Sequence, residues 1–411
     1  MTAADHPSPS LPLTGNPAQV WRLPFYRNAA ISLFLSGMGI SAAQPLLTLF
    51  FVNELGVSLS VASLYFLTAF ASLPVSILLG RVSDRLPSRL PLIRIAGLWV
   101  PVGWVLMAVA QQMWMVFAIA IIWLSVSSTM NAQTFAAVRD DLINRGYANH
   151  GRLITNIRVA WALGWVLGPM LGTWFGMSVG MRPLFLLTAA LFPISLLPTL
   201  RFRIPRASVT VTPASTVAGE TPTRESAMPL YLFIGCCIIA MSGETLKWSF
   251  LPVYMEQSLD APSWLRGAVI STHPFMEVSL IPLGGLLAER LGGYRVILVS
   301  VLFGAIGYLM FAIGGSIGIL FLGQFFSAIM LATLLPLGMA VATEFYPSGP
   351  GYAASVFLSG LGLASSIGGL IGSTSVRWMG LPEVFLLPTF TCLIAALGLF
   401  ALRARSATAR S

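Results

Sequence analysis

Charged side chains are scarce in this sequence: Asp, Glu, Lys and Arg make up 9% of the 411 residues, whereas apolar residues make up 56%. An ordinary soluble domain carries roughly 25% charged residues, and a chain this poor in charge could not cover a soluble surface. The composition therefore predicts a membrane protein in contact with the lipid bilayer. The net charge of +9 does not indicate a nucleic-acid partner, because the basic residues lie in short loops between apolar runs.

Histidine and cysteine are also rare, with three residues of each. Cys236, Cys237 and Cys392 lie inside apolar runs, and their spacing fits neither a disulfide framework nor a metal site. The sequence has no G-x-x-x-x-G-K-[ST] loop, so ATP does not drive this chain directly. We expect no cofactor and no enzymatic activity. The alternative from a different functional class is an intramembrane enzyme. Such an enzyme needs a nucleophile and a base, or metal ligands, that converge at membrane depth.

The first 26 residues are polar, rich in Pro and Ser, and lack the pattern of a signal peptide. We interpret residues 1–26 as a disordered cytoplasmic tail. A spanning helix needs about 20 mostly apolar residues, and runs of this length predict an all-α membrane protein with twelve transmembrane helices. The predicted spans are 28–52, 60–82, 91–110, 114–137, 152–176, 183–200, 229–254, 264–288, 294–314, 318–342, 352–376 and 382–402.

The arginines orient these spans. With the N-terminus inside, eighteen arginines lie in cytoplasmic loops and tails, and only Arg182, Arg266 and Arg377 lie on the opposite side. Cytoplasmic loops carry the excess of basic residues in membrane proteins. The asymmetry predicts a multi-pass protein of the bacterial cytoplasmic (inner) membrane with both termini in the cytoplasm.

A longer polar segment, 201–228, divides the spans into two sixes. It predicts a cytoplasmic linker between an N-terminal six-helix bundle, 27–200, and a C-terminal bundle, 229–402, which a tail, 403–411, follows. A short motif follows the second span of each bundle, 205 residues apart, and many secondary transporters are built from such repeats. Its residues are Gly80, Asp84, Arg85 and the following Arg89 in the first bundle, and Gly285, Glu289, Arg290 and the following Arg295 in the second.

This doubled motif resembles the signature loop of the major facilitator superfamily, with Pro87 where the family often has Gly. The resemblance covers the whole chain. It implies two pseudo-symmetric six-helix bundles in a monomer that works as a secondary active transporter by alternating access. It also implies a conformational gating role for the motif residues of both halves, to which we add Asp140 at the end of span 4.

Within that superfamily the chain most resembles bacterial sugar efflux transporters. The resemblance rests on residues 132–139, Arg158 and Trp165, the Gly168-Pro169 pair, Glu277 and Gln324. It implies export of sugars or glycosides. The Gly-Pro pair also resembles the antiporter motif of drug exporters, so a multidrug/H+ antiporter is the alternative. A channel or a receptor is a further alternative, but the internal repeat argues against both.

Five ionisable residues fall at membrane depth, where such side chains are costly and mark functional sites. They are Arg158, Glu244, Lys247, His273 and Glu277. We predict that Arg158 and Glu277 bridge the two halves in one conformation and bind substrate hydroxyls in the other. The alternatives are snorkelling of Arg158 and a structural hydrogen bond of Glu277 with His273. Glu244, His273, Glu277 and Lys247 are candidates for proton coupling, against the simpler interpretation of Glu244 and Lys247 as a neutralised pair.

Aromatic and amide side chains complete the candidate substrate site. Arg158, Trp161 and Trp165 share one helical face, where indole rings could stack on a sugar and the guanidinium could donate to its hydroxyls. For Trp161, helix packing is an equal alternative. Amides in spans also commonly hydrogen-bond neighbouring helices. The amide candidates are Gln133, Gln324, Asn131 and Gln44.

Overall fold

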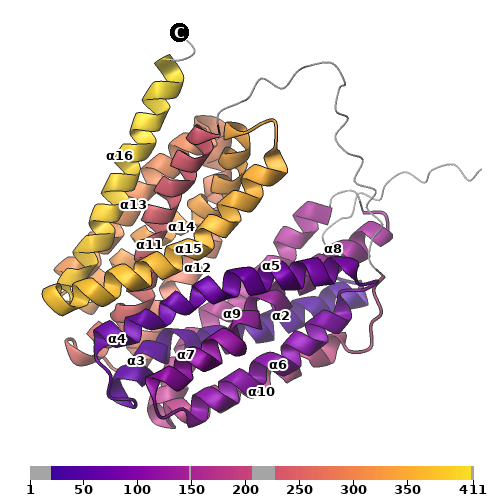
Figure 1. Cartoon of the computed structure of the whole chain (residues 1–411), viewed down its shortest axis with the longest axis horizontal. Helices are drawn as coiled ribbons and strands as arrows, with labels where there is room; N and C mark the ends of the chain where they lie inside the picture. The colour runs from indigo at the N-terminus through magenta and orange to yellow at the C-terminus, as the bar shows by residue number, and fades with distance from the viewer. Residues whose placement is uncertain (1–19, 148–149, 206–226, 409–411) are drawn as a thin grey trace, which may run out of the picture.

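The computed structural model describes residues 20–147, 150–205 and 227–408. Within these ranges helices dominate and no β-strand is present, so the predicted all-α class is confirmed (Figure 1). Most of the predicted N-terminal tail (1–19), most of the predicted linker (206–226) and the last three residues (409–411) lie outside the described residues.

The N-terminal half contains six helical segments, three of which include a short 3-10 turn within their length. They are α2 (Pro24–Ala43) with η1 (Gln44–Leu46) and α3 (Leu47–Asn53); α4 (Leu59–Ser63) with η2 (Leu64–Thr68) and α5 (Ala69–Arg85); α6 (Leu90–Val109); α7 (Met113–Ile122) with η3 (Leu124–Val126) and α8 (Ser127–Asn144); α9 (His150–Ser178); and α10 (Met181–Leu196) with η4 (Leu197–Thr199). Pro45, which has no amide hydrogen to donate, lies in the turn that interrupts the first segment.

The C-terminal half repeats this arrangement with longer uninterrupted helices. They are α11 (Met228–Gln257), α12 (Ser263–Leu291), α13 (Gly293–Ile313), α14 (Ile317–Phe345), α15 (Pro350–Met379) and α16 (Leu386–Thr408), the last preceded by η5 (Glu383–Phe385). The predicted spans agree with these helices except at their polar ends. The largest difference is at α8, which continues to Asn144 through a polar turn in which Asp140 and Asp141 form ion pairs.

Nine helical segments of the described ranges are long and apolar enough to cross a membrane. The three others are 59–85, α9 and α12, and the last two have 29 residues each. A helix of that length measures about 40 Å at 1.5 Å per residue, so polarity rather than length sets α9 and α12 apart, whereas the apolar stretch described within 59–85 is the shorter Leu59–Ser72. These three lie where the halves meet: α9 packs along α12, and α15 packs against α4, η2 and α5.

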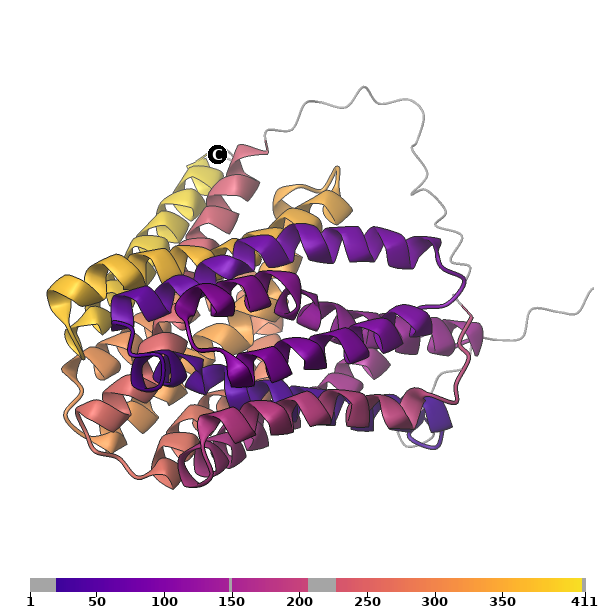
Figure 2. The same cartoon turned by 60° about the horizontal axis from the view of Figure 1, so that its bottom comes forward.

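The helix ends form two faces. We call the face with the 85–90 loop, residues 200–205 and the start of α11 the linker face, and the other the opposite face. Near the opposite face the two halves lie together, whereas towards the linker face α11 and α16 turn away from α5 and α8 in both views (Figures 1 and 2). The halves therefore diverge at the linker face in this conformation.

Glycines bring equivalent helices into contact in the two halves. A Cβ at Gly168 of α9 would clash with Ser41 of α2, and a Cβ at Gly368 of α15 would clash with the Ser242 carbonyl of α11. The fifth helix of each half thus packs closely on the first. Close packing through small residues is how helices associate in lipid, where apolar burial gives no drive.

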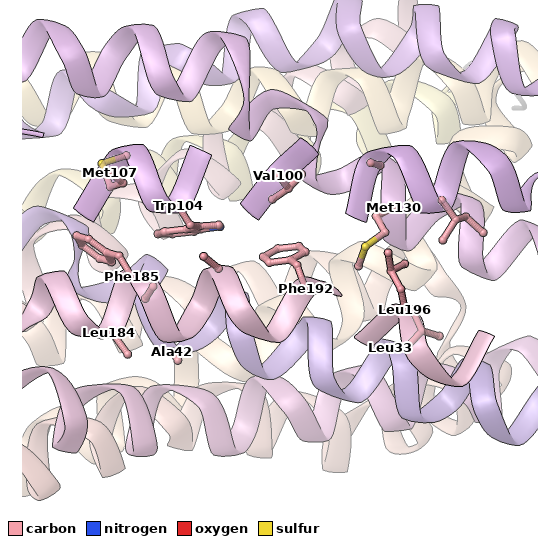
Figure 3. Packing of buried hydrophobic residues seen from close by; sticks show 14 of the residues in the cluster. Leu33, Ala42, Val100, Trp104, Met107, Met130, Leu184, Phe185, Phe192 and Leu196 are labelled. Atoms are coloured by element: carbon pink, nitrogen blue, oxygen red, sulfur yellow. The ribbon is translucent and has the colours of Figure 1, made fainter. Parts of the chain in front are cut away.

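Each half has its own apolar core. Figure 3 shows the N-terminal core, in which Trp104 of α6 lies beside Phe185 and Phe192 of α10, and Leu33 of α2 and Met130 of α8 lie further along. Four exposed tryptophans, Trp114, Trp174, Trp264 and Trp378, lie near helix ends at the opposite face. Exposed indoles at helix ends are typical of a membrane–water boundary.

Candidate functional site

A buried ionic network lies inside the C-terminal half. The Lys247 ammonium is 2.7 and 3.0 Å from the two carboxylate oxygens of Glu244, one turn away on α11, and 2.9 Å from Nδ1 of His273 on α12. Tyr308 of α13 donates to Glu244 Oε1 at 2.8 Å. Ser327 Oγ of α14 lies 3.1 Å from His273 Nδ1. Four helices therefore share one polar cluster.

Burial of these ionisable side chains carries a free-energy cost. Glu244, Lys247 and His273 are 7%, 1% and 1% exposed, and Lys247 is the only lysine in the sequence. Because a lysine ammonium only donates, the Nδ1 atom that faces it must accept, which leaves the hydrogen of a neutral His273 on Nε2. That atom lies 3.7 Å from Glu244 Oε2. A glycine next to Glu244, Gly243, leaves room for the Tyr308 ring against α11.

Glu244 and His273, both predicted at membrane depth, thus lie next to each other, and Lys247 contacts both. Glu277, one turn beyond His273 on α12, is only partly buried. The charge of Glu244 repels its carboxylate, and the charges of Lys247 and Arg158 attract it. Whether any of the four carries a proton remains a prediction.

A row of aromatic rings crosses the interface between the halves. Trp161 and Trp165 of α9 lie 5.5 Å apart, Trp165 lies 6.1 Å from Trp248 of α11, and Trp248 lies 6.3 Å from the ring of His273. The Lys247 ammonium lies 5.6 Å from the centre of the Trp248 ring. The row joins the N-terminal half to the ionic network.

Two indole N–H groups in this row lack a partner. Nε1 of Trp161 and of Trp165 are buried, and neither has a hydrogen-bond partner among the described residues. Such groups are rare in folded proteins and call for an explanation. Trp161 lies against Gly37 of α2, which favours helix packing for this residue, whereas Trp165 contacts the other half. Trp248 is a residue that the sequence analysis missed.

Arg158 and Glu277 do not form an ion pair in this conformation. Within the described part of the chain, no contact of 4.0 Å or less joins them. Arg158 is exposed, on the linker-face side of Trp165, with its guanidinium 6.0 Å from the centre of the Phe135 ring. The divergence of the halves at that face gives a reason for the separation. The predicted bridge therefore requires a conformation in which the halves are closer there.

At the linker face, Arg89 connects helices of the N-terminal half. Its Nε donates to Asp140 at 2.8 Å, and its Nη1 donates to Ser83 at 3.1 Å and to Gln133 at 3.2 Å. Ser83 also donates to Gln133 at 2.5 Å. Gln133, predicted as a substrate ligand, thus belongs to this cluster. Four of the other gating candidates are exposed: Arg85, Glu289, Arg290 and Arg295. A Cβ added at Gly80 or Gly285 would meet no close neighbour, and the Asp84 side chain lies outside the described part.

The remaining amide candidates have different surroundings. Asn131 is buried and accepts a hydrogen bond from Ser36 of α2 at 2.9 Å. Gln324 is buried on α14, and no described residue is a partner for its Oε1. Gln44 is exposed and lines a pocket of about 170 Å³ with residues of η2, α5, η3 and α15, among them Tyr65 and Ser365. Gln324 and Gln44 therefore have free polar atoms, whereas Asn131 is used between helices.

At the opposite face, a second charged cluster joins the halves. Asn53 at the end of α3 donates to Glu256 of α11 at 3.1 Å, and Arg266 of α12 lies 3.1 Å from the other oxygen of Glu256. Sequence reasoning missed these residues, because charges at helix ends are common. Close by, Arg182 and Glu54 form a 2.8 Å ion pair within the N-terminal half.

Within the described ranges, no group of His, Cys, Asp or Glu side chains is placed to hold a metal ion.

Known proteins resemble this chain along nearly its whole length. Sugar efflux transporter A of Dickeya chrysanthemi is 27% identical over 374 residues, 85% of this chain and 90% of the relative. Sugar efflux transporter B of Salmonella typhimurium is 24% identical over 88% of this chain and 93% of the relative. Quinolone resistance protein NorA of Staphylococcus aureus is 26% identical, but over 132 residues and 31% of this chain.

Solved structures show the same fold. The nucleoside transporter NupG matches with a TM-score of 0.74 at 18% identity, over 92% of this chain and 98% of that one. The peptide transporter POT in complex with sulfate matches with a TM-score of 0.74 at 15% identity, over 95% and 99%. The sequence model of the Major Facilitator Superfamily matches residues 29–268 and 232–411. The chain is therefore a multi-pass membrane transporter of the Major Facilitator Superfamily, as its doubled loop motif predicted.

Proposed function

We propose that this transporter exports sugars or glycosides by alternating access across the bacterial cytoplasmic membrane, in exchange for protons, with its linker face in the cytoplasm. The observation that carries the proposal is the unpartnered indole N–H of Trp165 at the interface between the halves. An indole ring offers a flat apolar surface to the C–H face of a sugar, and its N–H can donate to a hydroxyl. Similarity to sugar efflux transporters over most of the chain supports the same class of substrate.

Further groups for a neutral polar solute lie along the same interface. Arg158 is exposed on α9 and can donate from its guanidinium, and Glu277 on α12 can accept. Gln44 lines the pocket against α15. A sugar needs both donors and acceptors around an apolar surface, and these three side chains with Trp165 supply them.

The ionic network supplies a candidate for proton exchange. A carboxylate, an amine and an imidazole within 4 Å of one another can hold different numbers of protons with small movements. Ionisable groups at membrane depth commonly form proton relays in transporters. Glu244 and His273 are the proposed proton-carrying residues, and Lys247 is their charged neighbour.

Alternating access needs a gate at each face. The Asn53–Glu256–Arg266 cluster holds the halves together at the opposite face, where they already lie close. The Arg89–Asp140 pair joins helices at the linker face, where the halves diverge. The conformation thus fits a state open towards the cytoplasm, ready to receive a solute for export.

A multidrug/H+ antiporter is the second candidate, favoured by the partial similarity to NorA. The two are separated by flux of labelled sugars, glycosides and cationic drugs into proteoliposomes that contain the purified protein. Sugar flux that Trp165→Ala reduces, with no drug flux, supports the proposal. Drug flux without sugar flux would overturn it.

A further inference from the structure

One aromatic ring contacts both the substrate surface and the ionic network. Trp248 meets Trp165 of the N-terminal half on one side, with ring centres 6.1 Å apart, and His273 on another, with ring centres 6.3 Å apart. Lys247 lies within 5.6 Å of the same ring. Trp248 is only partly buried, whereas Glu244, Lys247 and His273 behind it are almost fully buried.

The spacing between Trp165 and Trp248 leaves no room for a solute. The two rings meet edge to face, with an interplanar angle of 75° and centres 6.1 Å apart. Edge-to-face aromatic rings in direct contact have centres about 4.5–7 Å apart, so nothing fits between these two rings. A sugar that stacks on Trp165 from this side must therefore displace Trp248.

We propose that Trp248 is a positioning residue that separates the substrate surface from the ionic network, and that a bound solute moves it and opens the network to the transport pathway. This inference rests on the proposed function and adds how the two sites are coupled. Displacement of Trp248 removes its contacts with His273 and Lys247 at the same time. Water can then reach groups that the ring covered.

The polar and ionisable groups around the network come from five helices. They are Glu244 and Lys247 of α11, His273 and Glu277 of α12, Tyr308 of α13, Ser327 of α14 and Cys392 of α16. Of the ionisable ones, Glu277 alone is not fully enclosed. Opening beside Trp248 would thus give the enclosed groups a second route to water, next to the solute.

The single lysine makes this opening measurable without any transport assay. A small amine-acylating reagent can modify only Lys247 and the N-terminal amine, which peptide mass spectrometry distinguishes. In the wild type without solute, Lys247 should stay unmodified while the N-terminal amine reacts. Trp248→Ala should raise the rate of Lys247 modification by about tenfold or more, because modification tracks the population of the open form.

Three further variants define the effect. Trp174→Ala removes an exposed indole from the end of α9, far along the helix from Trp165, and should leave Lys247 protected. Trp248→Phe retains a ring and should keep most of the protection, whereas Trp248→Leu should lose it, so the result does not depend on the alanine variant alone. Size-exclusion profiles would confirm that each variant is folded.

A transported sugar should raise Lys247 modification in the wild type and add little in Trp248→Ala. Equal modification in Trp248→Ala, Trp248→Leu and the wild type would overturn the inference, whatever the flux results. An absence of sugar flux would instead overturn the proposed function, and the comparison of the variants without solute would still stand. The two failures are therefore distinct.

Discussion

Asn53 and Glu256 form a side-chain hydrogen bond of 3.1 Å that joins α3 of the N-terminal half to α11 of the C-terminal half. Glu256 also holds Arg266, which is 7% exposed. The bond lies at the opposite face, where the halves must separate if the transporter is to release its solute there. Its strength should set how readily that face opens.

Glu256→Gln should favour the state open at the opposite face. A hydrogen bond to a charged group contributes about 1.5–3 kcal/mol and a neutral one about 0.5–1.5 kcal/mol, and the amide keeps the shape of Glu256 but removes the charge that strengthens the bond from Asn53. Distances between spin labels on the ends of α3 and α11 would report the shift. Glu54→Gln is the matched control, because its ion pair with Arg182 lies at the same face but within one half. An equal shift in both variants would argue against a latch at Glu256.

Trp165→Ala should weaken solute binding with little loss of stability. Aromatic contacts contribute about 0.5–1.5 kcal/mol beyond area burial, so the KM for a transported sugar should rise several-fold while the maximal rate changes less. Trp99, an exposed indole of α6, offers the control. The substrate role of Trp165 would be refuted by an unchanged KM.

Glu244 and Lys247 should behave as a unit. Removal of one partner of a buried ion pair costs about 3–5 kcal/mol, because the other charge is left unpaired. Glu244→Gln and Lys247→Met alone should each lower the thermal unfolding temperature clearly, and the double variant should recover much of the loss. Additive losses in this double-mutant cycle would show that the pair is not coupled.

The same double variant separates structure from proton coupling. A folded Glu244→Gln, Lys247→Met protein should still equilibrate sugar across the membrane but should no longer respond to a pH gradient. If the gradient still drives accumulation in this variant, the protons are carried elsewhere, and Glu277 becomes the first residue to test.

Charge reversal at Arg158 or Glu277 should reduce flux by preventing the conformation in which the halves are closer at the linker face. Arg158→Glu and Glu277→Arg should each reduce flux by about tenfold or more, the cost of a like-charge contact at an interface. Exchange of the two charges in one protein should restore part of it. Normal flux in each single variant would exclude the predicted bridge.

The sequence predicted well how deep the ionisable residues lie in the membrane, and less well which side chains contact one another. Apolar run lengths located most helix ends within a few residues, since rise per residue is constant along a helix, and Glu244 and His273 do lie inside the spans, as predicted. Depth alone could not reveal Trp248, because an indole in an apolar run looks like packing. The depth of Gln133 could not predict its contact with Arg89 either, because that contact depends on how α5 and α8 are rotated about their axes.

The distance between Arg158 and Glu277 could not be predicted for a different reason. Their helices, α9 and α12, do lie side by side. The separation depends on which of two conformations the halves adopt, and helix patterns do not encode that balance.

The proposed transport cycle exchanges sugar for protons. The most direct measurement is uptake of a labelled sugar into proteoliposomes with an acidic interior, where outward proton flow should drive the sugar in. We predict accumulation above the external concentration, its collapse when a protonophore dissipates the gradient, and its absence in the Glu244→Gln, Lys247→Met variant. Sugar that reaches the same level with and without the gradient, or fails to enter at all, would exclude the proposed exchange.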